Sequence, residues 1–150
     1  MSCALALVAA FALSPAAAGG ASPTSAAAGA PATRLAAEPL FADIVSRARS
    51  LHRRTQAYAA SGTVADAALF RADLSRLAEL DMEGHRTLAA RGTDPDLKCM
   101  LRGMSEDLTR RLGEIDRAAD AAARRAALTG LGTTLEENAG VIEAPSRPPV

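Results

Sequence analysis

Two residues of one predicted helix, Asp81 and His85, carry side chains that could bind a metal or transfer a proton. They are four positions apart, so they lie on the same face of a helix. Leu74, Leu77 and Leu88 follow the same stripe, which the periodicity predicts to be buried. A carboxylate and an imidazole would therefore enter the protein interior, where polar groups need partners.

Methionines and an asparagine are expected close to this pair. If the second and third helices are antiparallel neighbours, Met82 lies level with Met104 and His85 lies beside Met100. The last predicted helix contributes Asn138 at about the same height. Imidazole and thioether groups are soft ligands that suit copper and are also found on haem iron. The candidate ligands for copper or haem are His85, Met104, Met100, Met82 and Asp81.

A structural interpretation of these residues needs no ligand. Methionine fills irregular helical cores, and a buried asparagine such as Asn138 fixes the register of packed helices. The imidazole of His85 would then cap a backbone carbonyl or pair with Asp81. Because one histidine provides fewer strong ligands than a metal site normally has, we expect the structural role and no cofactor. Copper or haem binding is the alternative.

No catalytic motif accompanies these residues. The sequence has only two histidines, His52 and His85, and Arg49 and Met82 occupy the positions of a Glu-x-x-His pair. The glycines at 130–132 lack both the third glycine and the preceding strand of a phosphate-binding loop. The 17 basic residues balance 17 acidic ones, which gives no electrostatic reason to expect nucleic acid. We predict that the protein is not an enzyme.

Four amphipathic helices are predicted to position these side chains. The first begins at Pro39, which the first helical turn tolerates, and ends at Gly62. A capping box at Thr63 and Asp66 starts the second helix, which ends at Gly92. Spacings of three and four define their buried faces, which are Phe41, Ile44, Ala48, Leu51, Thr55 and Tyr58, and then Ala67, Phe70, Leu74, Leu77, Asp81, His85 and Leu88.

The third and fourth helices complete the set. Residues 93–96, Thr-Asp-Pro-Asp, combine a cap, a proline at the first helical position and acids that suit a helix N-terminus. Asp120 is expected to cap the fourth helix. The buried faces are Leu97, Leu101, Met104, Leu108, Leu112 and Ile115, and then Leu128, Leu131, Leu135, Asn138 and Ile142. Short links favour an antiparallel, up-down-up-down four-helix bundle, with a three-helix arrangement as the alternative.

The N-terminal segment is predicted to be a signal peptide covering residues 1–18. Residues 3–13 form an apolar run, which Ser14 and Pro15 interrupt, and Ala16–Ala18 supply the small residues that a signal peptidase requires. The run is too short to span a bilayer, which needs about 20 residues. We expect cleavage after residue 18 and a periplasmic or secreted protein; a disordered alanine-rich tail is the alternative.

The folded part is expected between two segments of low complexity. Residues 19–37 are mostly Gly, Ala, Ser, Pro and Thr, which predicts a flexible linker. The helical bundle is assigned to residues 38–143, and residues 144–150 form a proline-rich tail.

One stretch of the bundle has a local likeness to a known family. The residues that carry it are Leu108, Leu112, Ile115, Ala118, Leu128 and Thr129. With them, residues 108–131 resemble the first helical hairpin of cytochrome b562, a resemblance that implies haem held by a Met on the first helix and a His on the last. Met104 is one position out of register and no histidine follows His85, so we do not assign the chain to that family.

The expected function is therefore that of an exported, non-catalytic helical bundle. It would act in the cell envelope by binding or scaffolding another protein, whose identity the sequence does not indicate. The alternative is a periplasmic four-helix bundle that binds copper or haem.

Overall fold

The computed structural model describes residues 35–144, and within this range the chain is all-helical, with four helices and no strand. The predicted signal peptide, residues 19–34 of the predicted linker and residues 145–150 of the predicted tail lie outside the described residues. The helices are α2 (Pro39–Ser61), α3 (Ala67–Arg91), α4 (Pro95–Asp116) and α5 (Ala121–Glu143). A break at residues 117–120 separates α4 from α5, so the three-helix alternative is wrong.

The helices begin and end at the residues that the sequence indicated. Pro39 and Pro95 occupy the first helical position of α2 and α4. Asp120 caps α5, because its carboxylate accepts a hydrogen bond from the Ala123 backbone N–H at 2.7 Å. α2 and α3 end at glycines with φ of 73° and 67°, a left-handed conformation that glycine adopts without steric cost.

Two predicted N-terminal caps are absent. Thr63 and Asp66 form no capping box; Asp66 stands at the N-cap of α3 without a side-chain capping bond. Its carboxylate instead accepts hydrogen bonds from Tyr58 and Arg54 of α2. Asp94 precedes α4 with φ of 47° and also makes no capping bond with its side chain. The box is wrong because a contact with the neighbouring helix occupies the carboxylate that would have capped α3.

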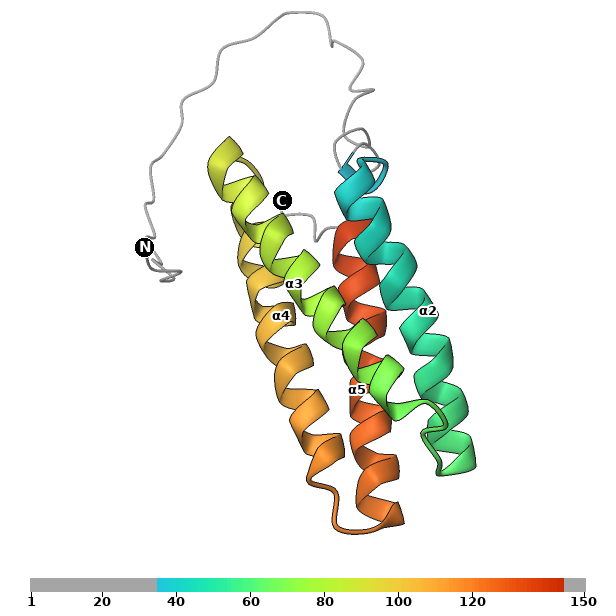
Figure 1. Ribbon diagram of the computed structural model, residues 1–150. Helices are drawn as coiled ribbons and strands as arrows, with labels where there is room; N and C mark the ends of the chain where they lie inside the picture. Colours follow the sequence, from blue (N-terminus) through green and yellow to red (C-terminus); the bar gives the residue numbers. More distant parts are fainter. Residues whose placement is uncertain (1–34, 145–150) are drawn as a thin grey trace, which may run out of the picture.

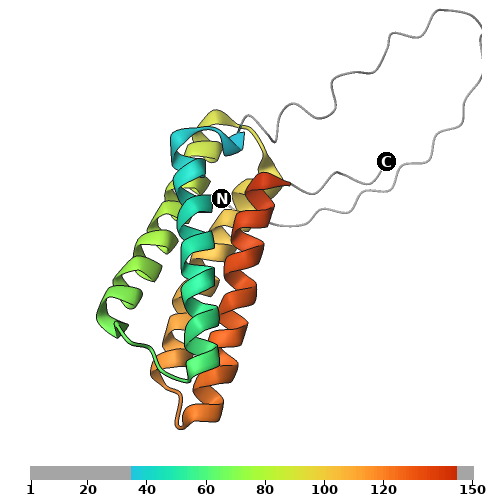
Figure 2. The ribbon, with the colours of Figure 1, turned by 90° about the vertical axis from the view of Figure 1, so that its right-hand side faces the viewer.

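The four helices pack in a closed ring. α2 packs most closely against α5, and α3 against α4; α4 also contacts α5, and α2 contacts α3. Figure 1 shows that the α2–α3 and α4–α5 connections lie at one end of the bundle and the α3–α4 connection at the other. Figure 2 shows α2 and α5 side by side along their length. The backbones of α3 and α5 lie diagonally across the ring and make no close approach.

The core follows the predicted faces. All five predicted positions of α5 are fully buried, and leucine dominates the interior. Five predicted positions are more exposed than the stripes indicated: Ala67 is exposed, and Tyr58, His85, Met104 and Leu112 are only partly buried. Leu35 was assigned to the linker, but it is buried in the core, so the packed part of the chain starts before residue 38. Of the described helices, none has the length and apolar character needed to cross a membrane.

Candidate functional site

A polar pair lies inside the otherwise apolar core. Asp81 of α3 and Asn138 of α5 are both fully buried. The amide Nδ2 of Asn138 donates a hydrogen bond of 2.6 Å to Oδ2 of Asp81. The remaining oxygens, Asp81 Oδ1 and Asn138 Oδ1, have no hydrogen-bond partner among the described residues. The structure therefore joins two residues that the sequence had placed at one height of the bundle, and it leaves one oxygen of each unpaired.

Burial changes the acidity of Asp81. Removal of the carboxyl from water raises the pKa of Asp81 to about 7, although the hydrogen bond from Asn138 lowers it in part. Asp81 takes part in none of the ion pairs of the described residues. Near neutral pH this carboxyl is therefore protonated in a large fraction of folded molecules.

His85 is attached to α4 and not to Asp81. Its Nδ1 lies 2.8 Å from the backbone oxygen of Lys98. Because a carbonyl oxygen only accepts, Nδ1 carries the hydrogen and Nε2 is left without one in the neutral ring. This is the carbonyl-capping contact of the structural interpretation.

The three candidate methionines lie between the core and the surface. Met82, Met100 and Met104 are partly buried, and Met100 packs against the core cluster. Within residues 35–144 no three side chains of the types His, Cys, Asp and Glu lie close enough to hold a metal ion together.

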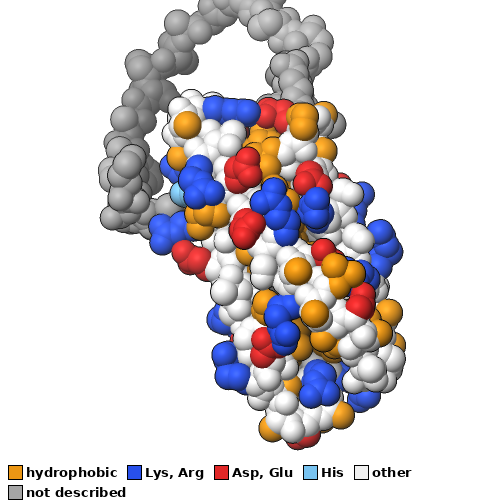
Figure 3. All heavy atoms as spheres, in the orientation of Figure 1, with side chains coloured by type: hydrophobic (Ala, Val, Ile, Leu, Met, Phe, Trp, Pro, Cys, Tyr) orange, Lys and Arg blue, Asp and Glu red, His pale blue; other side chains and the backbone are white. Residues whose placement is uncertain are grey.

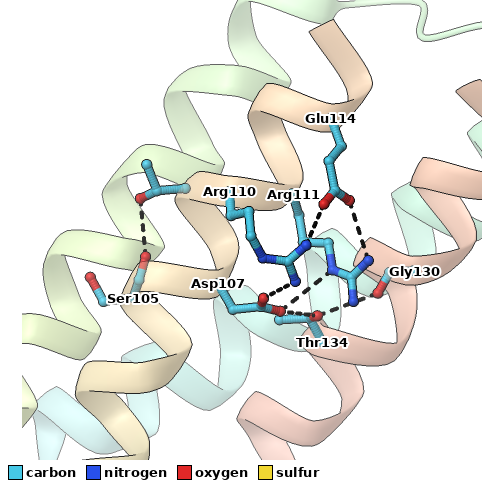
Figure 4. A network of polar contacts seen from close by, with 8 residues as sticks. Ser105, Asp107, Arg110, Arg111, Glu114, Gly130 and Thr134 are labelled. Atoms are coloured by element: carbon cyan, nitrogen blue, oxygen red, sulfur yellow. Dashed lines mark hydrogen bonds and ion pairs between the residues drawn. The ribbon is translucent and has the colours of Figure 1, made fainter. Parts of the chain in front are cut away.

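A second polar network lies between α4 and α5 (Figure 4). Asp107 of α4 accepts a hydrogen bond of 2.7 Å from the hydroxyl of Thr134 and forms ion pairs with Arg110 and Arg111. Glu114, one turn further along α4, forms ion pairs with the same two arginines. These four ion pairs join residues three or four positions apart on α4, whereas the hydroxyl of Thr134 comes from α5.

Asp107 has an acidity opposite to that of Asp81. Partial burial alone would raise the pKa of Asp107, but the hydrogen bonds from Thr134 and Arg110 and the charges of both arginines lower it below the ordinary value. Asp107 is consequently ionised wherever the protein is near neutral pH.

A cleft opens at the end of the bundle where α2 ends and α5 begins. Its volume is about 360 Å³. Figure 3 shows apolar side chains reaching the surface among basic ones toward this end of the molecule. Arg71 forms an ion pair with Asp116 there, whereas Arg124 forms none with the described residues. This end cleft is lined by Gly62, Thr63, Val64, Ala67, Phe70, Arg71, Leu112, Ile115, Asp116 and Arg124.

Sequence reasoning did not find the end cleft. Phe70, Leu112 and Ile115 are predicted to be core residues. Phe70 and Ile115 belong to the core and Leu112 packs against it, but all three also line the cleft. The one available signal was Val64, an apolar residue in a short link that otherwise needs none.

A groove of about 470 Å³ runs between α2 and α5. His52 lies in it, with Nδ1 2.9 Å from the backbone oxygen of Gly132. The hydroxyl of Thr55 is buried beside Gly132 and has no hydrogen-bond partner among the described residues. His52 thus ties α2 to α5 as His85 ties α3 to α4, through a ring nitrogen and a backbone carbonyl.

Comparison with known proteins assigns the chain to no family. No protein-family model, no curated protein and no solved structure matches the sequence. A function must therefore be inferred from the contacts and charges of this chain.

Proposed function

We propose that this protein is an exported, non-catalytic, up-down-up-down helical bundle that acts in the cell envelope by binding another protein. The observation that supports the proposal is the end cleft, which combines an apolar floor with charged residues at its rim. Protein interfaces have this construction, with an apolar centre enclosed by a polar edge. The apolar run before residue 14 supports the export part of the proposal.

The charges of the end cleft indicate the chemistry of the partner. Two arginines, Arg71 and Arg124, face one carboxylate, Asp116, so the cleft carries an excess of positive charge. Phe70 and Ile115 offer apolar contact below them. A volume of about 360 Å³ suits one or two side chains. We propose that the partner inserts an apolar side chain next to an Asp, a Glu or a terminal carboxylate.

Photo-cross-linking in the native host tests this binding site. A photoreactive residue at Val64, inside the end cleft, is expected to cross-link one envelope protein, and Arg124→Glu is expected to abolish that product. The matched control is the same photoreactive residue at Ser50, on the exposed side of α2. Equal cross-linking from both positions, or a product that survives Arg124→Glu, would contradict the proposed site.

Export is tested separately. N-terminal sequencing of protein from the native host is expected to begin at Gly19, directly after Ala18. Recovery of the intact chain from the cytosol would refute export and would leave the end cleft as a binding site in another compartment.

One contact favours the alternative, a copper or haem site at His85. Histidines that bind metals usually donate their second ring N–H to a carbonyl or a carboxylate, and His85 does so to Lys98. Its Nε2 would then be the ligand atom, with thioethers from Met82, Met100 or Met104. Titration of Cu(I) and of haem against wild type, His85→Ala and Met104→Leu tests this. Tight binding that either substitution weakens at least tenfold would establish the alternative over the structural role.

A further inference from the structure

The two unpaired oxygens of the buried pair are of the same chemical kind. An ionised carboxylate only accepts hydrogen bonds, and the oxygen of an amide also only accepts. With Asp81 ionised, one hydrogen bond joins Asp81 to Asn138, and Asp81 Oδ1 and Asn138 Oδ1 both lack a donor inside the core. Leaving buried acceptors unpaired is unfavourable, and leaving a buried charge unpaired is more so.

One proton removes both defects. A hydrogen on Asp81 Oδ1 turns that oxygen into a donor, and Asn138 Oδ1 is the acceptor that still lacks one. With that second hydrogen bond the carboxylic acid and the amide would form a closed ring, and the pair would have no net charge.

No other described group competes for this role. The buried residues of α2 and α4 include no charged side chain, and α5 contributes only Thr134 and Asn138 as buried polar residues. On the adjoining turns, His85 binds the carbonyl of Lys98, and Asp107 is occupied by Thr134 and two arginines.

We propose that Asp81 and Asn138 form a proton-dependent lock between α3 and α5, closed when Asp81 carries a proton and weakened when the proton leaves. Among the described residues this pair makes the one hydrogen bond that joins these two diagonal helices. Ionisation would place a charge opposite an acceptor oxygen in an apolar core, so separation of the helices would relieve it. An exported protein meets a pH that the cell does not control, and this lock would make the bundle tightest in acid.

The direction of the pH dependence follows from linkage. The ordinary pKa of Asp is 3.8, and the folded value is about 7. Between these values the unfolded chain has lost the proton while the folded chain keeps it, so unfolding becomes easier as pH rises. The stabilisation from the protonated pair is fully present below about pH 4 and is lost above about pH 7.

The first experiment measures the protonation state of Asp81 directly. In the full 150-residue chain, the side-chain carboxyl carbon of Asp81 is followed by NMR from pH 4 to pH 9. A midpoint near 7 supports the lock. A midpoint near 4 overturns it, because the carboxyl would then be ionised in the neutral folded protein.

The second experiment uses a variant that cannot ionise. Asp81→Asn keeps two amides that can exchange two hydrogen bonds, so it should fold with a pH-independent pair. Between pH 5 and pH 7 its folding constant relative to wild type is expected to rise about 50-fold. Asp107→Asn is the matched control, and its ratio to wild type should not rise over this range. An equal pH response of wild type and Asp81→Asn overturns the lock; if Asp81→Asn does not fold, the NMR midpoint of the wild type decides alone.

Discussion

Two aspartates of this bundle contact neighbouring turns of α5 and respond to the contact in opposite ways. Asp81 is bonded to Asn138 and has a raised pKa; Asp107 is bonded to Thr134 and has a lowered pKa. Both contacts are short, at 2.6 and 2.7 Å. The distance to the partner therefore does not decide the protonation state.

The surroundings of the two carboxyls account for the difference. Asp81 is fully buried with a single neutral donor, whereas the Asp107 side chain is 30% exposed and has two arginines beside it. One amide does not replace the water that an ionised carboxylate loses on burial, but a hydroxyl, two cations and remaining solvent do. The comparison indicates that the surroundings of Asp81 favour its protonated form and that those of Asp107 favour its ionised form.

The largest expected effects come from the apolar framework that surrounds both sites. Leu74→Ala on α3, the helix of Asp81, and Leu108→Ala on α4, the helix of Asp107, should each lower the free energy of unfolding by about 2–5 kcal/mol, because each leaves a cavity in the core. Leu69→Ala is the control, since Leu69 is 57% exposed, and it should change stability by less than about 0.5 kcal/mol. Chemical denaturation measures all three. Neutral results at both buried positions would show that the described core is wrong.

Replacement of Asn138 removes the neutral hydrogen-bond donor beside Asp81 and should lower the stability of the bundle. Asn138→Leu is expected to cost about 1–3 kcal/mol at neutral pH, because Asp81 loses its only hydrogen-bond partner. Chemical denaturation of the variant measures this cost. An unchanged free energy of unfolding would show that the bond from Asn138 contributes nothing to stability.

The parts of this fold that are local in sequence were predictable. Spacings of three and four identified four helices, and Gly62, Gly92, Pro39 and Asp120 marked boundaries that the structure confirms. The capping box at residues 63–66 failed, because a capping rule considers only neighbours in the chain. The carboxylate of the box had a competing partner on another helix.

The sites were predictable only in part, for the same physical reason. The 3.6-residue period placed Asp81 and Asn138 on buried faces, and reasoning about height brought them together. It could not show that their hydrogen bonding is incomplete, which depends on contacts between side chains. The ion pairs of Asp107 join residues three and four positions apart, a spacing that can be read from the sequence, whereas Thr134 is 27 positions away and leaves no periodic signal.

A smaller effect is expected where a hydroxyl is removed from the charged site. Thr134→Val keeps the shape of a side chain that is 2% exposed and deletes its hydrogen bond to Asp107, at a cost of about 1 kcal/mol. The pKa of Asp107 should rise, because Thr134 is one of the groups that lower it. Thr129→Val is the control: Thr129 is exposed and bonds only within its own helix. Equal costs for the two variants would show that the bond to Asp107 contributes nothing specific.

The smallest effects should differ in sign between the two sites, and two glycines provide the test. A Cβ at Gly84, one turn from Asp81, would lie 3.0 Å from Leu101 Cδ1 and 3.3 Å from Phe41 Cε1. These side chains are enclosed by the core and cannot move far. Gly84→Ala should therefore destabilise by about 1 kcal/mol, because the overpacking exceeds the helix propensity that alanine adds.

At the charged site the same substitution meets a different neighbour. A Cβ at Gly130 would lie 2.6 Å from Nη1 of Arg111, the far end of a flexible side chain at a partly exposed position. The guanidinium can swing aside, and at most it loses its ion pairs with Glu114 and Asp107, which lie within one helix and contribute about 0.3–0.5 kcal/mol each. The gain in helix propensity, about 1 kcal/mol, should then leave Gly130→Ala at least as stable as wild type, by up to about 0.5 kcal/mol. Denaturation midpoints of the two variants, measured in one buffer, compare the signs directly. If both variants are destabilised, the side chains around Arg111 are packed as rigidly as the core around Asp81. The two sites would then not differ in how far their side chains can move to accept a new methyl group.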